Sequence, residues 1–205
     1  MNPYYWFCYN LIRLAGRIFF RLRVVHGERM INHGPVILAA NHQSYLDPPL
    51  AGSVSRRPIY FLARKSLQDG WFFGWLLPKL NVIPVDAESG KDRTALKALI
   101  RILRAGQGTL VFPEGGRTPD GALQPALPGV GLVIAKTLAP VVPMRIFGAY
   151  EAWPINQKRP RFRPVTVVVG EPIYFTAADL EPAGKDLYQR LSQRVMNAIA
   201  ALSID

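Results

Sequence analysis

Short apolar runs alternate with helix-like segments along most of this 205-residue chain. The runs are rich in Val, Ile and Leu and fall at residues 36–40, 59–63, 82–85, 109–112, 141–146 and 165–169. Short runs that are apolar at consecutive positions are typical of strands buried on both faces. Strands that alternate with helices favour a largely parallel arrangement. We therefore predict an α/β fold, in which a single domain has a largely parallel central sheet covered by helices.

The segments between these runs carry helix signals. Ser89 followed three positions later by Asp92 resembles a capping box, which predicts a helix that continues through Arg104. Residues 130–138 are largely apolar and predict a second, buried helix. Proline is tolerated in the first turn of a helix, so we expect the C-terminal helix to begin at Pro182.

The N-terminal segment has the composition of a membrane-contacting helix. Residues 1–12 contain no charged side chain and are rich in Tyr, Trp and Phe, but they are too few to span a bilayer. Arg13, Arg17 and Arg21 recur at helical spacing and would form one polar stripe. We predict that residues 1–23 form an amphipathic helix in the membrane interface, followed by a second domain at residues 24–205. The alternative is a helix that packs on the protein's own core.

A second aromatic segment, residues 71–77, contains Trp71, Phe72, Phe73 and Trp75. Three interpretations fit such a dense apolar run. It could belong to the core, line the mouth of an apolar ligand groove, or contact lipid headgroups. These interpretations differ in the exposure of the side chains, which the sequence does not give.

The run N-H-Q-S-Y-L-D at residues 41–47 directly follows the first apolar run and precedes Pro48 and Pro49. It therefore lies in a predicted strand-to-helix turn, where side chains can be aimed at a ligand. His42 and Asp47 would lie about 140° apart on a regular helix, so only the turn could bring them together. A neutral imidazole can take a proton from a hydroxyl, and a carboxylate on its other nitrogen stabilises the imidazolium. The alternative is a turn histidine bonded to the backbone and an aspartate that caps the next helix.

A second motif, P-E-G-G-R-T at residues 113–118, follows the apolar run at 109–112. Gly115 and Gly116 permit close approach of the backbone to a ligand, and Arg117 offers a planar fork of donors. This combination suits a phosphate or carboxylate held by two hydrogen bonds. The alternative is a Pro-Gly turn with a solvated arginine.

The formal net charge of +11 and the isoelectric point near 10.2 predict an anionic partner, such as a nucleic acid, a phospholipid surface or a phosphorylated substrate. Zinc-finger spacing, an RRM-type aromatic motif and a basic zipper are all missing from the sequence, so we expect no nucleic-acid partner. His26, His33 and His42 lack any recognised metal-ligand spacing, so we expect no metal site. Cys8 is the only cysteine, so no internal disulfide can form.

Taken together, the two motifs resemble those of the glycerolipid acyltransferase family, specifically the bacterial 1-acylglycerol-3-phosphate acyltransferases. The segments F-L-A-R-K-S-L, N-V-I-P-V-D and V-V-P-M resemble three further blocks of that family, in the expected order. The resemblance covers roughly residues 24–150. Two positions depart from the family pattern. Gly116 stands where threonine or asparagine is usual, and Ala87 stands where arginine is usual.

The resemblance implies transfer of a fatty acyl group from an acyl thioester to the free hydroxyl of 1-acylglycerol 3-phosphate, giving phosphatidic acid. The donor would be acyl-CoA or an acyl carrier protein, and no cofactor would be needed. An enzyme of this kind is expected to be peripheral on the cytoplasmic face of the cell membrane, on an anionic lipid surface. Two alternatives stay open: an enzyme for glycerol 3-phosphate or another lysophospholipid, and a catalytically inactive lipid-binding module.

The resemblance also implies roles for individual residues. His42 would be the general base, and Asp47 would orient it. The acceptor would be bound by the side chains or backbone of Arg64, Lys65, Glu114, Gly115, Gly116 and Arg117. Within that group, Arg117 would grip the phosphate, and Arg64 and Lys65 are further candidates for the same phosphate.

Overall fold

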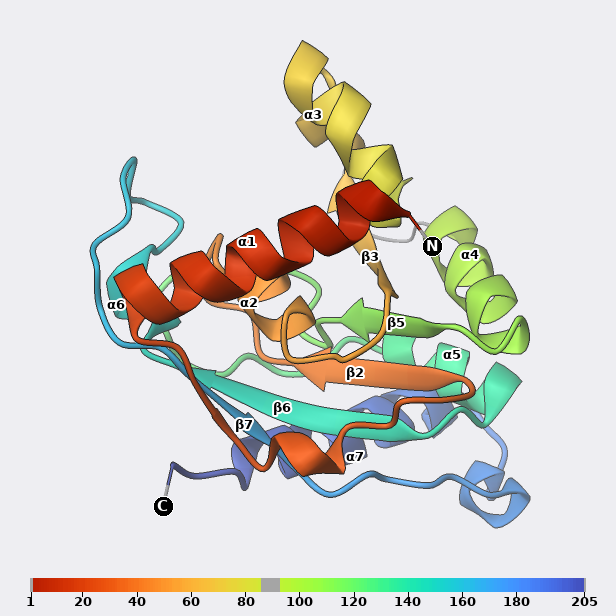
Figure 1. Ribbon diagram of the computed structural model, residues 1–205. Coiled ribbons are helices and arrows are strands. Elements are labelled where there is room, and N and C mark those ends of the chain that lie inside the picture. The colour runs from red at the N-terminus through yellow and green to blue at the C-terminus, as the bar shows by residue number, and fades with distance from the viewer. Residues whose placement is uncertain (1, 86–92, 205) are drawn as a thin grey trace.

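The central sheet has seven strands in the order β1-β7-β6-β2-β5-β3-β4 (Figure 1). The computed structural model describes residues 2–85 and 93–204. The strands are β1 (Arg23–Val25), β2 (Val36–Ala40), β3 (Ile59–Arg64), β4 (Val82–Val85), β5 (Gly108–Val111), β6 (Val141–Phe147) and β7 (Thr166–Val169). The helices are α1 (Pro3–Phe20), α2 (Asp47–Gly52), α3 (Trp71–Leu76), α4 (Arg93–Arg104), α5 (Gly129–Thr137), α6 (Ala149–Ala152) and α7 (Leu187–Ala200).

Each pairing of these strands is parallel except the one between β6 and β7. The prediction of a largely parallel sheet is therefore confirmed. β2 lies between β5 and β6, and the chain leaves β2 towards β3 on one side but leaves β6 towards β7 on the other. Neighbouring strands whose connections diverge in this way open a crevice at their carboxyl ends, where α/β proteins bind ligands. The turn that carries the N-H-Q-S-Y-L-D motif starts at this crevice.

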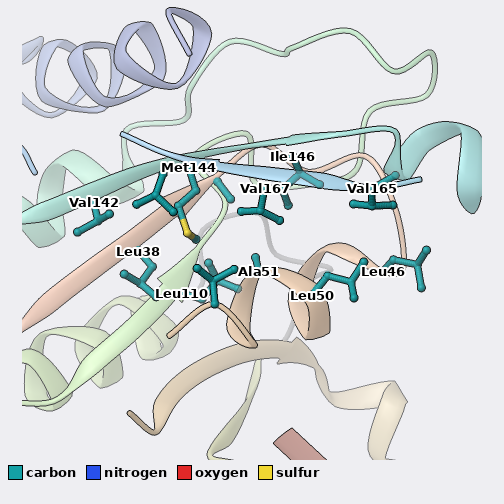
Figure 2. Packing of buried hydrophobic residues seen from close by; sticks show 14 of the residues in the cluster. Leu38, Leu46, Leu50, Ala51, Leu110, Val142, Met144, Ile146, Val165 and Val167 are labelled. Atoms are coloured by element: carbon teal, nitrogen blue, oxygen red, sulfur yellow. The ribbon is translucent and has the colours of Figure 1, made fainter. Parts of the chain in front are cut away.

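Both faces of the sheet are covered, because alternate residues of β2 enter different cores. Val36, Leu38 and Ala40 pack with α2 and the end of α1, whereas Ile37 and Ala39 pack with α4, α5 and α7. Figure 2 shows the first of these cores. Each side chain of β2 is at most 1% exposed, so the strand that leads into the first motif is held rigidly.

The predicted strands agree with the structure to within one residue at each end. The predicted helix that ends at Arg104 is α4, and the predicted helix at 130–138 is α5. The capping box at Ser89 and Asp92 lies outside the described residues. The sequence analysis missed β1, which is only three residues long and runs along β7.

The predicted start of the C-terminal helix at Pro182 is wrong, because α7 begins at Leu187. The Glu181 carboxylate accepts the N–H of Ala183 at 3.0 Å, which turns the chain away from a helical path. The Glu181 carbonyl accepts a hydrogen bond from the Arg190 side chain at 2.9 Å, which holds this segment beside α7 as a loop.

The helix α1 has apolar side chains on two opposite sides. Tyr5, Tyr9 and Phe20 are buried against the domain. The outer side is exposed and carries Tyr4, Phe7, Leu11, Leu14 and Ile18 at helical spacing. One side of α1 therefore packs on the core, as the alternative interpretation expects, and the other side faces outwards. Contact of that outer side with a membrane stays a prediction. None of the helices in residues 2–85 and 93–204 is long and apolar enough to cross a membrane.

The helix α3 stands out from the body of the protein (Figure 1). Trp71 is 88% exposed and the other aromatic side chains of the helix are about half exposed, so the interpretation of this segment as core is wrong. The start of α1 contacts the same region. The rings of Tyr4 and Trp75 lie 5.5 Å apart, and the Asn2 side chain donates to the carbonyl of Lys79 at 2.7 Å. We call the exposed apolar side chains of these helices the α1–α3 surface: Tyr4, Phe7, Leu11, Leu14, Ile18, Trp71, Phe72, Phe73 and Trp75.

Candidate active site

The turn that follows β2 brings His42 and Asp47 together. Nδ1 of His42 lies 2.9 Å from Oδ2 of Asp47, which is the first residue of α2. The same oxygen accepts the backbone N–H groups of Gln43 and Ser44, each at 2.6 Å. Asp47 is fully buried, so its carboxylate is fixed by the turn and cannot rotate into solvent. The alternative interpretation, in which Asp47 only caps the next helix, does not account for the contact between this carboxylate and the imidazole.

The imidazole of His42 packs on Phe112 with one ring face, and part of the ring is exposed to solvent. Its ring stacks on Phe112 with the ring centres 4.0 Å apart. The side chain is 17% exposed, and no residue in the described part of the chain hydrogen-bonds to Nε2. A carboxylate on Nδ1 and a free Nε2 is the arrangement that lets an imidazole take a proton from a hydroxyl.

Glu114 lies beside His42 but contacts its backbone. One carboxylate oxygen accepts the N–H of His42 at 3.0 Å, and the other accepts the N–H of Gln124 at 3.3 Å. Burial raises the pKa of the Glu114 carboxyl to about 7; those two N–H groups oppose the rise, and the Asp47 carboxylate adds to it. The structure therefore gives Glu114 a role in holding the turn that carries His42, beside the role in the acceptor pocket that the family resemblance implies.

The two glycines of the second motif differ in backbone conformation and in the space around them. Gly115 has a positive φ of 72°, and a Cβ on it would collide with Leu127. A Cβ on Gly116 would meet nothing within 4 Å, so space is open beside this residue. The loop is joined to the first motif by a hydrogen bond from the Thr118 N–H to the His42 carbonyl at 2.9 Å.

Arg117 is prepared to bind an anion. Its guanidinium carbon lies 3.7 Å from the centre of the Tyr45 ring. Nη1 of Arg117 is buried and has no hydrogen-bond partner within the described residues. A buried donor without a partner is costly, and a phosphate or carboxylate oxygen would satisfy it.

Tyr45 is a site residue that the sequence analysis missed. Its ring contacts the guanidinium of Arg117, and the centre of the Trp153 ring lies 5.3 Å away. Ser44, one residue earlier, donates its hydroxyl to the Trp153 carbonyl at 2.8 Å. The only sequence signal was the position of Tyr45 inside the N-H-Q-S-Y-L-D motif, and that position does not reveal a partner in a distant loop.

Asn41 connects the turn that carries His42 to β6. Its side chain accepts the N–H of Ile146 at 2.7 Å and donates to the carbonyl of the same residue at 3.1 Å. The Gln43 side chain donates to that carbonyl at 2.8 Å. The first motif is therefore bonded to β6 on one side of β2 and to the loop that follows β5 on the other.

Arg64 and Lys65 lie at the carboxyl end of β3, which pairs with β5 and does not touch β2. Both side chains are exposed. No hydrogen bond or ion pair among the described residues joins either of them to His42 or Arg117. The structure thus brings together His42, Asp47, Glu114 and Arg117, and it leaves Arg64 and Lys65 at the same edge of the sheet without a direct contact. Residues 2–85 and 93–204 contain no cluster of three or more His, Cys, Asp or Glu side chains that could hold a metal ion.

A family model described as Acyltransferase matches residues 22–147, which is more than half of the chain and includes both motifs. The chain is 29% identical over 148 residues to the chloroplastic 1-acyl-sn-glycerol-3-phosphate acyltransferase of Brassica napus, and the match covers 71% of this chain and 43% of that protein. It is 24% identical over 171 residues to the 1-acyl-sn-glycerol-3-phosphate acyltransferase of Bacillus subtilis, covering 83% of this chain and 82% of that protein. It is also 32% identical over 114 residues to a lyso-ornithine lipid O-acyltransferase of Pseudomonas aeruginosa, covering 56% and 42%.

The fold has a solved counterpart. The crystal structure of the 1-acyl-sn-glycerophosphate acyltransferase of Thermotoga maritima superposes with a TM-score of 0.76 at 24% identity, covering 97% of this chain and 80% of that one. This shows a shared fold. The chain spans less than half of the Brassica relative, but the family match runs through both motifs and the residues brought together around His42. The chain therefore belongs to the acyltransferase family.

Proposed function

We propose that this protein is a 1-acylglycerol-3-phosphate O-acyltransferase. It would move a fatty acyl group from an acyl thioester to the free hydroxyl of 1-acylglycerol 3-phosphate and so form phosphatidic acid. The observation that carries this proposal is the His42–Asp47 pair next to Arg117: among the described residues, neither Nε2 of His42 nor the buried Nη1 of Arg117 has a hydrogen-bond partner. A base and an anion site at one crevice suit an acceptor that brings both a hydroxyl and a phosphate.

The proposed mechanism uses the imidazole of His42 as a general base. Nε2 takes the proton of the acceptor hydroxyl while the oxygen attacks the thioester carbonyl. The tetrahedral intermediate then collapses, the carbon–sulfur bond breaks, and the imidazolium returns the proton to the departing thiolate. Asp47 stabilises the imidazolium through the contact at Nδ1. General-base catalysis of this kind contributes about 10²–10⁴-fold to the rate.

The acceptor would be oriented by its phosphate. Arg117 is the main candidate because its guanidinium is held flat on Tyr45 and its Nη1 is available. Gly115 and Gly116 would let the glycerol approach the loop backbone, and Glu114 would keep His42 in place from behind. Arg64 and Lys65 would contribute more weakly, by attracting the phosphate from the same edge of the sheet. The donor would be acyl-CoA or an acyl carrier protein, and the thioester itself supplies the activation, so the reaction needs no cofactor.

Acyl transfer measured with purified protein tests the proposal. The protein should convert radiolabelled oleoyl thioester and 1-acylglycerol 3-phosphate to phosphatidic acid. His42→Ala should reduce the rate by at least 10²-fold without loss of folded structure, and Asp47→Asn should lose nearly as much. A matched control is His33→Ala, since His33 is an exposed histidine outside the crevice. Activity of His42→Ala within a few-fold of wild type would refute the general-base role, whereas a wild-type protein that acylates no acceptor would favour the inactive lipid-binding module.

A second candidate function is acylation of another lysolipid. Two observations favour it: the similarity to the lyso-ornithine lipid acyltransferase, and the open space beside Gly116 where the family usually has a larger polar residue. A panel of acceptors, including glycerol 3-phosphate, 1-acylglycerol 3-phosphate and lysolipids without phosphate, distinguishes the candidates. A higher kcat/KM for a phosphate-free lysolipid would replace the first proposal with the second.

We further propose that the protein is peripheral on the cytoplasmic face of the cell membrane, with the α1–α3 surface in the lipid. The exposed apolar side chains of α1 and α3 support this, because such patches on soluble domains mark interaction sites. Aromatic side chains are favoured at the level of the headgroups, and basic residues add about 1 kcal/mol each near an anionic leaflet. Arg17 and Arg21, both exposed at the end of α1, are placed for that contribution.

Membrane binding is better tested by surface substitutions than by truncation. Removal of residues 1–23 would also remove Tyr5, whose hydroxyl accepts the Ile59 N–H at 3.2 Å inside the core. The triple variant Phe7→Ser/Leu11→Ser/Leu14→Ser changes only exposed side chains. It should sediment less with anionic vesicles than wild type. The control Tyr174→Ser removes an equally exposed side chain elsewhere and should sediment normally. Equal sedimentation of the triple variant and wild type would refute lipid contact through α1.

A further inference from the structure

A cavity lined by two arginines lies next to the proposed active site. It has a volume of about 560 Å³ and lies between α6 and the loop that follows it. Its lining includes Tyr150, Glu151, Gln157, Arg161 and Arg163. A cavity of this size falls within the range of small-molecule sites, roughly 300–1,000 Å³. The proposed roles of His42 and Arg117 leave it unused.

Hydrogen bonds connect the walls of this cavity to the catalytic loops. The Tyr150 hydroxyl donates to the carbonyl of Pro119, two residues after Arg117, at 2.9 Å. Trp153, whose ring centre lies 5.3 Å from that of Tyr45, donates its indole N–H to the Gln157 carbonyl at 2.9 Å. The cavity therefore borders the crevice where the reaction would occur.

The loop presents its two arginines to the cavity for a structural reason. Phe162 points the other way and stacks on Phe19 of α1, with the ring centres 5.1 Å apart. The alternation along residues 161–163 then places Arg161 and Arg163 together in the cavity lining. The backbone is fixed by a hydrogen bond from the Arg161 N–H to the Ala152 carbonyl at 2.7 Å.

The charges of the cavity favour an anion. Arg161 and Arg163 outnumber the single carboxylate of Glu151 in the lining. Neither arginine forms an ion pair with an acidic residue in the described part of the chain. Paired guanidinium groups are strong binders of phosphate esters, because each can donate two parallel hydrogen bonds.

We propose that this cavity binds the phosphate of the acyl donor, at the phosphopantetheine arm that carries the thioester. The inference rests on the proposed function, in which two substrates meet at His42 and the phosphate of the acceptor occupies Arg117. The donor then needs its own site on the other flank of β2, and α6 follows directly from β6 on that flank. Coenzyme A and an acyl carrier protein both present this phosphate, so the site serves either donor.

Two donor substrates that differ in one phosphate test the proposal. Wild type is assayed with oleoyl-4′-phosphopantetheine and with oleoyl-pantetheine, at saturating 1-acylglycerol 3-phosphate. We expect a KM about tenfold lower for the phosphorylated donor, which corresponds to about 1.4 kcal/mol. Arg161→Ala/Arg163→Ala should lose this preference while kcat with oleoyl-pantetheine stays unchanged. The control Lys158→Ala/Arg159→Ala removes the same charge from the same loop, outside the cavity lining, and should keep the preference.

Each contrary result has a distinct meaning. No preference in wild type, or a preference that survives in Arg161→Ala/Arg163→Ala, overturns the donor site. A rise in the KM for the acceptor alone would assign the cavity to the lysolipid headgroup and would also overturn it. Failure of wild type to acylate any acceptor would refute the proposed function. In that case, equilibrium binding of coenzyme A to wild type and to Arg161→Ala/Arg163→Ala still tests the cavity, and equal affinities would refute it.

Discussion

Replacement of Glu114 by Gln tests whether a carboxyl at the active site titrates near neutral pH. Burial raises the pKa of Glu114 to about 7 from its ordinary value of 4.5. Each tenfold change in a proton-binding constant is worth about 1.4 kcal/mol, so this rise corresponds to about 3 kcal/mol. The side chain is 8% exposed, so solvent screening reduces this value only slightly.

The sign follows from the state that binds the proton more tightly. The folded protein holds the Glu114 proton up to about pH 7, whereas the unfolded chain releases it near pH 4.5. The contribution to stability is therefore fully present below about pH 4.5 and is lost as the pH rises through about 7. Gln cannot release a proton in this range. The free energy of unfolding of wild type, relative to that of Glu114→Gln, should fall by about 3 kcal/mol between pH 4 and pH 8.

Urea unfolding followed by tryptophan fluorescence measures this difference at each pH. The control is Glu151→Gln, which neutralises an exposed carboxylate and so reports the effect of net charge alone. The informative quantity is the change with pH rather than the value at any one pH, because Gln also alters the hydrogen bonds to His42 and Gln124. Curves for wild type and Glu114→Gln that stay parallel from pH 4 to pH 8 would refute the raised pKa.

Three further variants test single contacts. Arg117→Lys keeps the charge but loses the planar fork, so the KM for 1-acylglycerol 3-phosphate should rise several-fold with little change in kcat, as steady-state kinetics would measure. Tyr45→Leu should raise the same KM, because it removes the ring under Arg117, whereas Tyr45→Phe should retain the wild-type value. Gly131→Ala should destabilise the fold by about 1–3 kcal/mol in urea unfolding, because a Cβ would collide with the Tyr188 carbonyl where α5 meets α7.

The strands and the first motif could be predicted because their signals are local. The run at 36–40 is apolar at consecutive positions, which only a strand covered on both faces requires. The pairing of His42 with Asp47 could be anticipated because five residues of turn join the two side chains. The start of α7 was predicted wrongly because Pro182 carries a stronger helix-start signal than Leu187. The competing hydrogen bond from the Ala183 N–H to the Glu181 carboxylate has no sequence signature.

The exposure of α3 could not be predicted from its sequence. A run of tryptophan and phenylalanine has the same composition whether its side chains are buried in a core or exposed at the surface. Whether the side chains of α3 are buried depends on which elements form the cores on the two faces of the sheet. The two cores of the sheet contain side chains of α1, α2, α4, α5 and α7, and no side chain of α3 belongs to either core. The aromatic side chains of α3 therefore remain outside, next to the start of α1.

The register of the sheet explains how motifs 72 residues apart form one site. Ala39 of β2 pairs with Val111 of β5. His42 and Glu114 each follow three residues beyond this pair, so the parallel strands deliver both residues to the same height at the sheet edge. At that edge the His42 N–H donates a hydrogen bond to the Glu114 carboxylate. A slip of one residue would place Gly115 opposite His42 and would exchange the buried and outer faces of the strand. The position of His42 therefore depends on the apolar packing that fixes this register.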